Sequence, residues 1–385
     1  MNFEYLTRFL DNTLPMVGVP GSDTVIYVDH KEVYRHQSGF DNLKFRTPVR
    51  DNALYLMYSC SKVSTCVAAT QLIEKGEIQV NEPLYAYFPE YRHMAVKVPR
   101  PDGTFDLVEA KNPITIRHLL SMTAGFNYDL DSPAIQDVKV KTSGKCPTRE
   151  VVRALADQPL EFEPGTHFRY SLCLDVVGGV VEEASGMRFG EYLKQNVFEP
   201  LGMNETGFFK GTEEQKSRLA TLYSVNKAAD TISEDNPDNL PYRFGTDYES
   251  GGAGLISSVH DQILLADALS DFGRGKNGYQ VLTKAGVELM RSNQLDETCI
   301  HDFWKMGNQM VGYGYGFGVR TQLYPARSGS LSPIGEFGWD GARLSYLAAI
   351  PERKIAVFHA EHVGAFHSFV EPRLINLVIS SLERD

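Results

Sequence analysis

Strand-like apolar segments lie near both ends of the chain, and this arrangement limits the folds that the chain can adopt. Near the N-terminus the apolar run Thr24–Val28 predicts a buried strand. Near the C-terminus Leu344–Ile350 and Lys354–His359 are separated by a short Pro-containing turn, and Val370–Leu382 follows with helical spacing. We therefore expect one antiparallel sheet that is built from both ends of the chain and closed by a helix.

Between these ends the apolar residues recur with the spacing of helices. A first amphipathic helix, followed by a turn at Gly18–Asp23, precedes the N-terminal strand. The 385 residues are expected to form a single domain of the α/β (α+β) class, with an α/β lobe at about 1–58 and 310–385 and a mostly helical lobe at about 59–309. A cleft between the lobes is the natural place for a site. The apolar stripe of the first helix consists of Phe3, Leu6, Phe9 and Leu10. The inner segments with helical spacing are Val63–Lys75, Ile116–Leu120, Arg149–Leu155, Leu174–Ala184 and Gln262–Ser270.

Composition excludes several classes of partner. The 38 basic and 49 acidic residues give a net charge of −11, and no run of Lys and Arg is present, so nucleic acid is not an expected partner. No segment of about twenty apolar residues occurs and the N-terminus lacks the pattern of a signal peptide, so we expect no membrane span and no secretion. Five cysteines without a C-x-x-C pair are typical of a reducing cytoplasm. Oligomeric state is not indicated.

Ser59 and Lys62 form the strongest chemical motif in the sequence. They follow the apolar run Leu54–Met57 and stand at the head of the helix Val63–Lys75, where the spacing i to i+3 places both on one face of the first turn. A serine hydroxyl becomes a useful nucleophile when a nearby base takes its proton, and a lysine can do this if burial lowers its pKa. The helix N-terminus adds N–H groups beside a developing oxyanion.

Taken alone, this S-x-x-K motif has a structural alternative. Ser59 could cap the helix while Lys62 is solvated. The chain also contains a second match, Ser224–Lys227, which lies in a polar segment and is interpreted as a surface turn.

Further segments, in the same order along the chain, resemble the class C β-lactamases and related esterases. The resemblance covers nearly the whole chain and implies a serine β-lactamase and penicillin-binding-protein fold, an acyl-enzyme on Ser59, and no metal or organic cofactor. The segments that carry it are Lys62–Tyr91, Thr115–Gly125, Glu163–Gly165 ahead of Tyr170–Ser171, Leu201–Met203, Gly251–Leu255, Tyr313–Gly318 and Gly338–Gly341.

Tyr170 matches the family tyrosine that lies close to the lysine and helps to move the serine proton. The alternative is a tyrosine that packs under a helix. As a base, a phenol with a pKa near 10 requires a cationic neighbour, and Lys62 could provide it. Leu172 departs from the family pattern, because it replaces an asparagine that would bind the amide side chain of a β-lactam.

A second departure concerns the third family element, which is Trp339-Asp340-Gly341 here. The lysine that would pair with a substrate carboxylate is missing. Trp-x-Gly, together with the spacing from Tyr170 to Asp175, is similar to the family VIII carboxylesterases and related acyltransferases. The resemblance implies substrate contacts from this element and from Leu172.

By alignment with the family, the N–H groups of Ser59 and Ala342 would form the oxyanion hole. Gly341 would allow the backbone to approach the acyl carbonyl closely. The expected function is a serine hydrolase, either a carboxylesterase or an acyltransferase, that acts on a small ester or amide. A β-lactamase or D-amino-acid peptidase and a catalytically silent binding protein remain alternatives.

Other candidate residues have weaker support. His359, Glu361, His362 and His367 lie close in sequence, but their spacing is not H-E-x-x-H and no metal site is expected there. Cys60 is interpreted as a small buried residue. His118 matches a structural family position.

Overall fold

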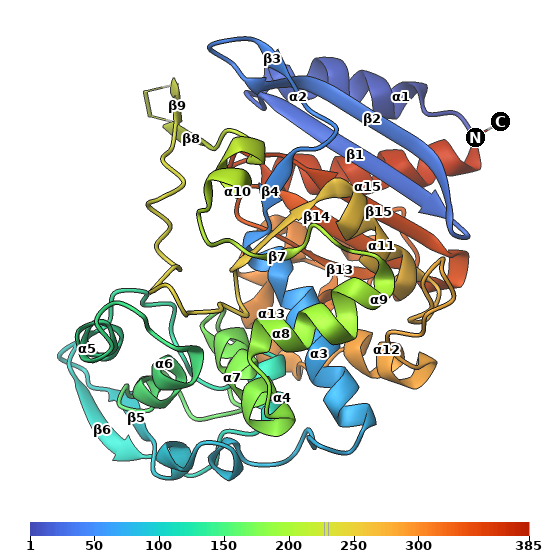
Figure 1. The fold of residues 1–385 in the computed structure, drawn as a ribbon. Helices are drawn as coiled ribbons and strands as arrows, with labels where there is room; N and C mark the ends of the chain where they lie inside the picture. Colours follow the sequence, from blue (N-terminus) through green and yellow to red (C-terminus); the bar gives the residue numbers. More distant parts are fainter. Residues whose placement is uncertain (227, 230, 385) are drawn as a thin grey trace.

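The computed structural model describes residues 1–226, 228–229 and 231–384 and contains an eight-stranded antiparallel sheet (Figure 1). Its central strands come from the two ends of the chain, which confirms the expected fold class. In spatial order the strands are β11 (Tyr313–Tyr315), β12 (Arg320–Gln322), β13 (Phe337–Asp340), β14 (Ser345–Ile350), β15 (Ile355–Ala360), β1 (Gly21–Val28), β2 (Lys31–Asn42) and β3 (Thr47–Pro48).

Helices cover both faces of this sheet because side chains alternate along each strand. Ile26 of β1 packs with the terminal helices α1 (Glu4–Arg8), α2 (Leu14–Met16) and α15 (His367–Glu383). Its neighbours Val25 and Tyr27 point to the opposite face and join the main core. The two termini lie side by side in Figure 1, and the Asn2 N–H donates to the Ser381 carbonyl over 2.9 Å.

The strand β1 begins earlier than the sequence predicts. The expected turn at Gly18–Asp23 ends at Gly21, where β1 starts and pairs with β2. Asp23 is 1% exposed, and its carboxylate accepts hydrogen bonds from Arg35 and Gln37. In the sequence alone, an aspartate at this position is typical of a turn, and its cross-strand partners are not visible. The start of β1 was therefore placed too late. The long strand β2 was not predicted.

The inner part of the chain is mostly helical and carries small two- and three-stranded sheets. Helix α11 lies within the stretch 59–309 that was expected to form the helical lobe, yet it packs against β1, β14 and β15. The helices are α3 (Ser61–Glu74), α4 (Ile116–Leu120), α5 (Pro133–Lys141), α6 (Thr148–Leu155), α7 (Cys173–Ser185), α8 (Phe189–Leu193), α9 (Glu199–Leu201), α10 (Glu213–Arg218), α11 (Val259–Ser270), α12 (Lys284–Arg291), α13 (Glu297–Trp304) and α14 (Pro325–Ser328). The strands are β4 (Leu54–Leu56), β10 (Leu255–Ser258) and β7 (Gly207–Phe208) in one sheet, and the hairpins β5 (Ala95–Pro99) with β6 (Phe105–Glu109) and β8 (Tyr223–Asn226) with β9 (Thr231–Glu234).

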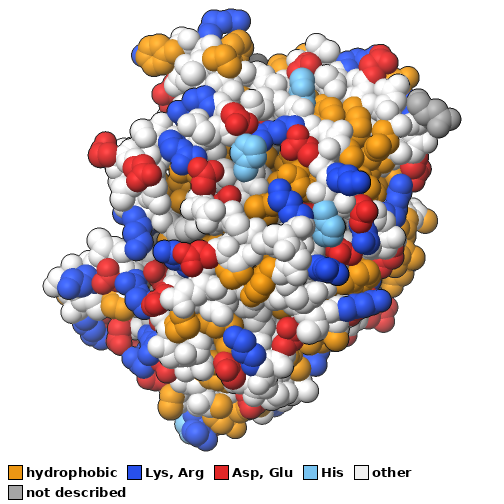
Figure 2. Space-filling model, turned by 45° about the vertical axis from the view of Figure 1, so that its right-hand side comes forward, with side chains coloured by type: hydrophobic (Ala, Val, Ile, Leu, Met, Phe, Trp, Pro, Cys, Tyr) orange, Lys and Arg blue, Asp and Glu red, His pale blue; other side chains and the backbone are white. Residues whose placement is uncertain are grey.

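The surface carries charges of both signs. On the face shown in Figure 2, Lys and Arg side chains are interspersed with Asp and Glu. Within the described residues, no helix combines the length and the apolar character that crossing a bilayer would require.

Candidate active site

Ser59 lies in a tight turn between β4 and α3. The turn is anchored by the Met57 N–H, which donates to the Leu255 carbonyl over 2.8 Å. Tyr58 adopts a left-handed backbone with φ of 45°, which is unfavourable for a bulky residue and is typical of functional sites. The sharp turn leaves Ser59 half-buried beside the first turn of α3, as the sequence predicted.

Lys62 is fully buried directly below Ser59. Its Nζ donates to the Ser59 Oγ over 3.2 Å and to the Gly252 carbonyl over 2.7 Å. Burial lowers the pKa of Lys62 from 10.5 to about 8, because the ammonium form loses its hydration. At pH 7 about a tenth of the amine is therefore unprotonated, against well under a thousandth for a lysine of ordinary pKa. The solvated lysine of the structural alternative is not what the structure shows.

A buried carboxylate partly opposes this effect. Asp175 of α7 is 2% exposed and accepts hydrogen bonds from the Tyr248 hydroxyl at 2.7 Å and from the Ser250 hydroxyl at 2.6 Å. Its negative charge raises the pKa of Lys62. A Cβ on Gly252 would lie 2.4 Å from the Asp175 Oδ2, so glycine allows the close approach of this segment. The sequence signals for this contact were the Gly-rich stretch 251–254 and the spacing from Tyr170 to Asp175.

Three aromatic rings surround the lysine and serine. Tyr170 lies with its ring 4.6 Å from the Lys62 Nζ, and its hydroxyl accepts a hydrogen bond from the Trp339 Nε1 over 3.0 Å. The Tyr128 ring stacks on that of Tyr170 at 5.8 Å. Burial raises the pKa of Tyr170 well above 10, Tyr128 adds to this effect, and a hydrogen bond with Ser59 opposes it. Tyr170 therefore remains a neutral phenol. Sequence reasoning missed Tyr128, which no motif marked.

The turn between β13 and β14 closes the other side of Ser59. A Cβ on Gly341 would lie 2.2 Å from the Met57 carbonyl oxygen, so this turn contacts the backbone two residues before Ser59. The Ser345 Oγ also donates to the Met57 carbonyl over 2.8 Å. Within the described part of the chain, the N–H groups of Ser59 and Ala342 donate to no other residue. Both backbone N–H groups are thus free to bind a ligand.

Two predicted substrate contacts lie elsewhere than expected. Leu172 is 3% exposed and packs in the main core at the start of α7, where it offers a ligand almost no surface. Trp339 and Asp340 are consecutive on β13 and therefore point to opposite faces. Trp339 stacks on Tyr170, whereas the Asp340 Oδ2 lies 3.7 Å from the His367 Nε2 on α15.

The histidines near the C-terminus do not gather into one cluster. His359 bonds Thr24 and Glu361, while His362 bonds the Thr221 carbonyl. Among the described residues one group has potential metal ligands within 4.8 Å of one another: Asp340, His367 and Glu371. The His367 Nε2 already contacts the Gly341 carbonyl at 2.9 Å.

The second S-x-x-K match has no such surroundings. Ser224 lies on β8, and its hydroxyl donates to Asp235. Lys227 lies outside the described residues. Cys60 is buried and its thiol pKa is raised to about 12 by burial, so it remains a neutral thiol.

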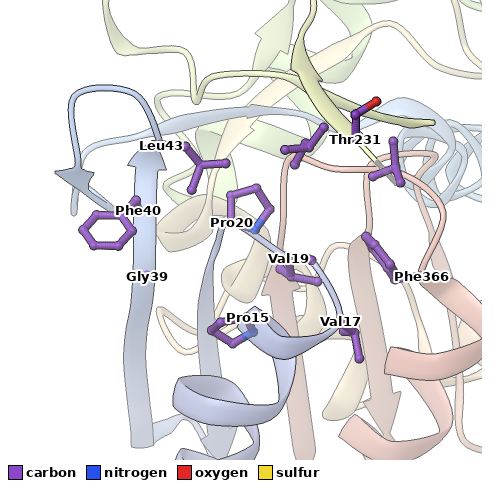
Figure 3. A pocket seen from close by; sticks show the side chains of 12 residues that line it. Pro15, Val17, Val19, Pro20, Gly39, Phe40, Leu43, Thr231 and Phe366 are labelled. Atoms are coloured by element: carbon purple, nitrogen blue, oxygen red, sulfur yellow. The ribbon is translucent and has the colours of Figure 1, made fainter. Parts of the chain in front are cut away.

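Two cavities lie next to each other, and the first of them reaches the turn that carries Ala342. One, of about 570 Å³, is lined by residues that include Tyr58, Ala342 and Arg343. The other, of about 560 Å³, is lined almost entirely by apolar side chains, among them Phe40 and Phe366 (Figure 3). Val225 lines both cavities, so they share one wall.

A serine held against a buried lysine of low pKa, with free backbone donors beside it, defines a serine hydrolase. The Beta-lactamase family model matches residues 6–360, and the chain belongs to this family. The chain is similar to Esterase EstB of Burkholderia gladioli, with 30% identity over 340 residues that cover 82% of this chain and 79% of that protein.

Solved structures agree with this assignment. The structure of EstCE1, described as a hydrolase with promiscuous acyltransferase activity, superposes with a TM-score of 0.78 at 25% identity and covers 99% of this chain and 98% of that one. Simvastatin synthase LovD from Aspergillus terreus superposes with a TM-score of 0.82 over the full length of both chains at 17% identity, a likeness of fold.

Proposed function

We propose that the chain cleaves or transfers the acyl group of small esters through an acyl-enzyme on Ser59. The observation that carries the proposal is the 3.2 Å contact between Ser59 and the buried Lys62, whose pKa of about 8 provides neutral amine at physiological pH. The esterase and acyltransferase names of the similar proteins support the same reaction class.

In the proposed reaction each proton has a defined path. The Ser59 Oγ attacks the acyl carbonyl and its proton passes to the Lys62 Nζ. The N–H groups of Ser59 and Ala342 hold the negative oxygen. The Tyr170 phenol, which keeps its proton because its pKa is well above 10, donates to the leaving alkoxide and is reprotonated from Lys62. Water or another alcohol then attacks the acyl-enzyme and loses its proton to the Lys62 Nζ, which passes a proton to the Ser59 Oγ as the acyl–oxygen bond breaks.

The surroundings of Trp339 favour esters over β-lactams in this proposal. Trp339 stands where the family lysine would pair with a substrate carboxylate, and the next residue, Asp340, faces α15, so this element offers no cation to such a group. Five buried, unpaired cysteines support a reducing compartment such as the cytoplasm.

The test compares p-nitrophenyl acetate, p-nitrophenyl butyrate and nitrocefin as substrates of the wild type and Ser59→Ala. We expect turnover of both esters, little turnover of nitrocefin and no activity in Ser59→Ala. Labelling with a fluorophosphonate, detected as a mass increase on the Ser59 peptide, reports the nucleophile independently of the substrate. Nitrocefin as the better substrate would contradict the ester assignment, and absence of labelling would favour a silent binding protein.

A further inference from the structure

We propose that His367 is a positioning residue that aims the Ala342 N–H at the acyl oxygen. It would act through the Gly341 carbonyl, which belongs to the same peptide unit as the Ala342 N–H. The inference rests on the proposed function, because it assigns His367 a part in the oxyanion hole of that site.

The peptide between Gly341 and Ala342 is held from its carbonyl side. The His367 Nε2 lies 2.9 Å from the Gly341 carbonyl oxygen, and the Leu344 N–H donates to the same oxygen over 2.7 Å. The Gly341 N–H is bound as well, since it donates to the Ser345 carbonyl over 2.8 Å. The first two hydrogen bonds hold the Gly341 carbonyl, and the third holds the preceding peptide, so the orientation of the Gly341–Ala342 unit is fixed from both directions.

A trans peptide is planar, and its C=O and N–H point in opposite directions. Because His367 and Leu344 occupy the carbonyl side, the Ala342 N–H must point away from α15. Ala342 lines the cavity beside Tyr58, and its N–H has no acceptor among the described residues. The N–H that His367 orients is therefore free to bind a ligand oxygen on the side away from α15.

The same contact also makes the N–H a stronger donor. A carbonyl oxygen can only accept, so the His367 Nε2 carries a proton in this contact. The Asp340 Oδ2 lies 3.7 Å from the same nitrogen. Hydrogen bonds in series polarise one another, so donation to the Gly341 carbonyl increases the positive charge on the Ala342 N–H.

His367 is itself held in place by its position in the fold. It is the first residue of α15, and its side chain is 21% exposed. The segment that leads into α15 also packs on this turn, because a Cβ on Gly364 would lie 2.9 Å from the Ala342 carbonyl oxygen. The helix and the turn thus meet at two points.

The experiment compares His367→Leu, which removes the donor, with His367→Gln, which can supply an amide N–H. His36→Leu is the matched control, because the side chain of His36 is 27% exposed and bonds Asp11 near the N-terminus rather than the turn at Gly341. We expect His367→Leu to lower kcat for p-nitrophenyl butyrate roughly 10- to 100-fold with KM changed less than about threefold. His367→Gln is expected to recover most of this loss, and His36→Leu to retain wild-type kcat.

A second readout separates positioning from general damage. Phenylboronic acid forms a tetrahedral adduct with a nucleophilic serine, and its inhibition constant should rise in His367→Leu by about the same factor as kcat falls. The melting temperature of each variant verifies folding, and His367→Met replaces His367→Leu if that protein does not fold.

Unchanged kcat in His367→Leu, or an equal loss in His367→Gln, would overturn the inference while the esterase assignment stands. A wild type that turns over no ester would overturn the proposed function and this inference with it.

Discussion

Replacing Lys62 with methionine tests whether burial of the charged amine lowers both the pKa of Lys62 and the free energy of unfolding of the protein. The pKa falls from 10.5 in an unfolded chain to about 8 in the folded protein. The difference of 10.5 − 8 corresponds to about 3 kcal/mol, at about 1.4 kcal/mol per pKa unit. Because the folded pKa is depressed, this cost is fully present below pH 8 and disappears as the pH rises to 10.5.

Methionine has a similar length and no charge, so Lys62→Met carries no such cost. It does leave the Gly252 carbonyl without its 2.7 Å donor, which costs about 1–3 kcal/mol at every pH. The informative quantity is therefore the pH dependence of the difference between the two proteins. We expect the free energy of unfolding of the wild type, relative to Lys62→Met, to rise by about 2 kcal/mol between pH 7 and pH 10.

Urea unfolding at pH 7 and pH 10, followed by circular dichroism, measures this difference. The slope of the free energy against urea must be the same in both proteins for the comparison to hold. Lys62→Met should also lose ester turnover. A difference in stability that does not change with pH would refute the reasoning, because it would show that Lys62 keeps an ordinary pKa when folded.

Three further predictions concern the same site. Tyr170→Phe should lower kcat about 10²- to 10⁴-fold with little change in melting temperature, since the ring still stacks on Trp339; a kcat within threefold of wild type would make Tyr170 a packing residue. Asp175→Asn should move the acid limb of the kcat/KM profile to lower pH, because loss of the negative charge lowers the pKa of Lys62 further; a shift to higher pH would contradict this sign. Gly341→Ala should lower both the melting temperature and kcat, because its Cβ would lie 2.2 Å from the Met57 carbonyl oxygen; wild-type values for both would show that the turn adapts.

The sequence predicted the parts of the site that depend on local spacing. Ser59 and Lys62 lie three residues apart on one helical turn, so their contact follows from helix geometry alone. Tyr170 was found through its family motif. Tyr128 lies in a loop without a motif and reaches the site by stacking on Tyr170, a contact that no periodicity records.

Strand geometry explains why Trp339 and Asp340 do not share the role that the sequence assigned to them together. Trp339 and Asp340 were both expected to contact substrate, but consecutive residues of a strand face opposite sides. Once Trp339 is known to face Tyr170, Asp340 must face α15, where it meets His367. The packing of α11 against the sheet was also not predicted. It depends on the path of the chain in space, which the spacing of apolar residues does not record.

The pairing of β1 with β15 also has a consequence during synthesis of the protein. The strand β1 can pair with β2 at once, but its second partner, β15, in which Ala360 pairs with Asp23, leaves the ribosome more than three hundred residues later. At about 5–20 residues per second this delay is roughly 20 s to one minute. Throughout that time the segment carrying Ser59 and Lys62 exists without the β13–β14 turn. The proposed site of a nascent chain is therefore incomplete until nearly all of the chain has been translated.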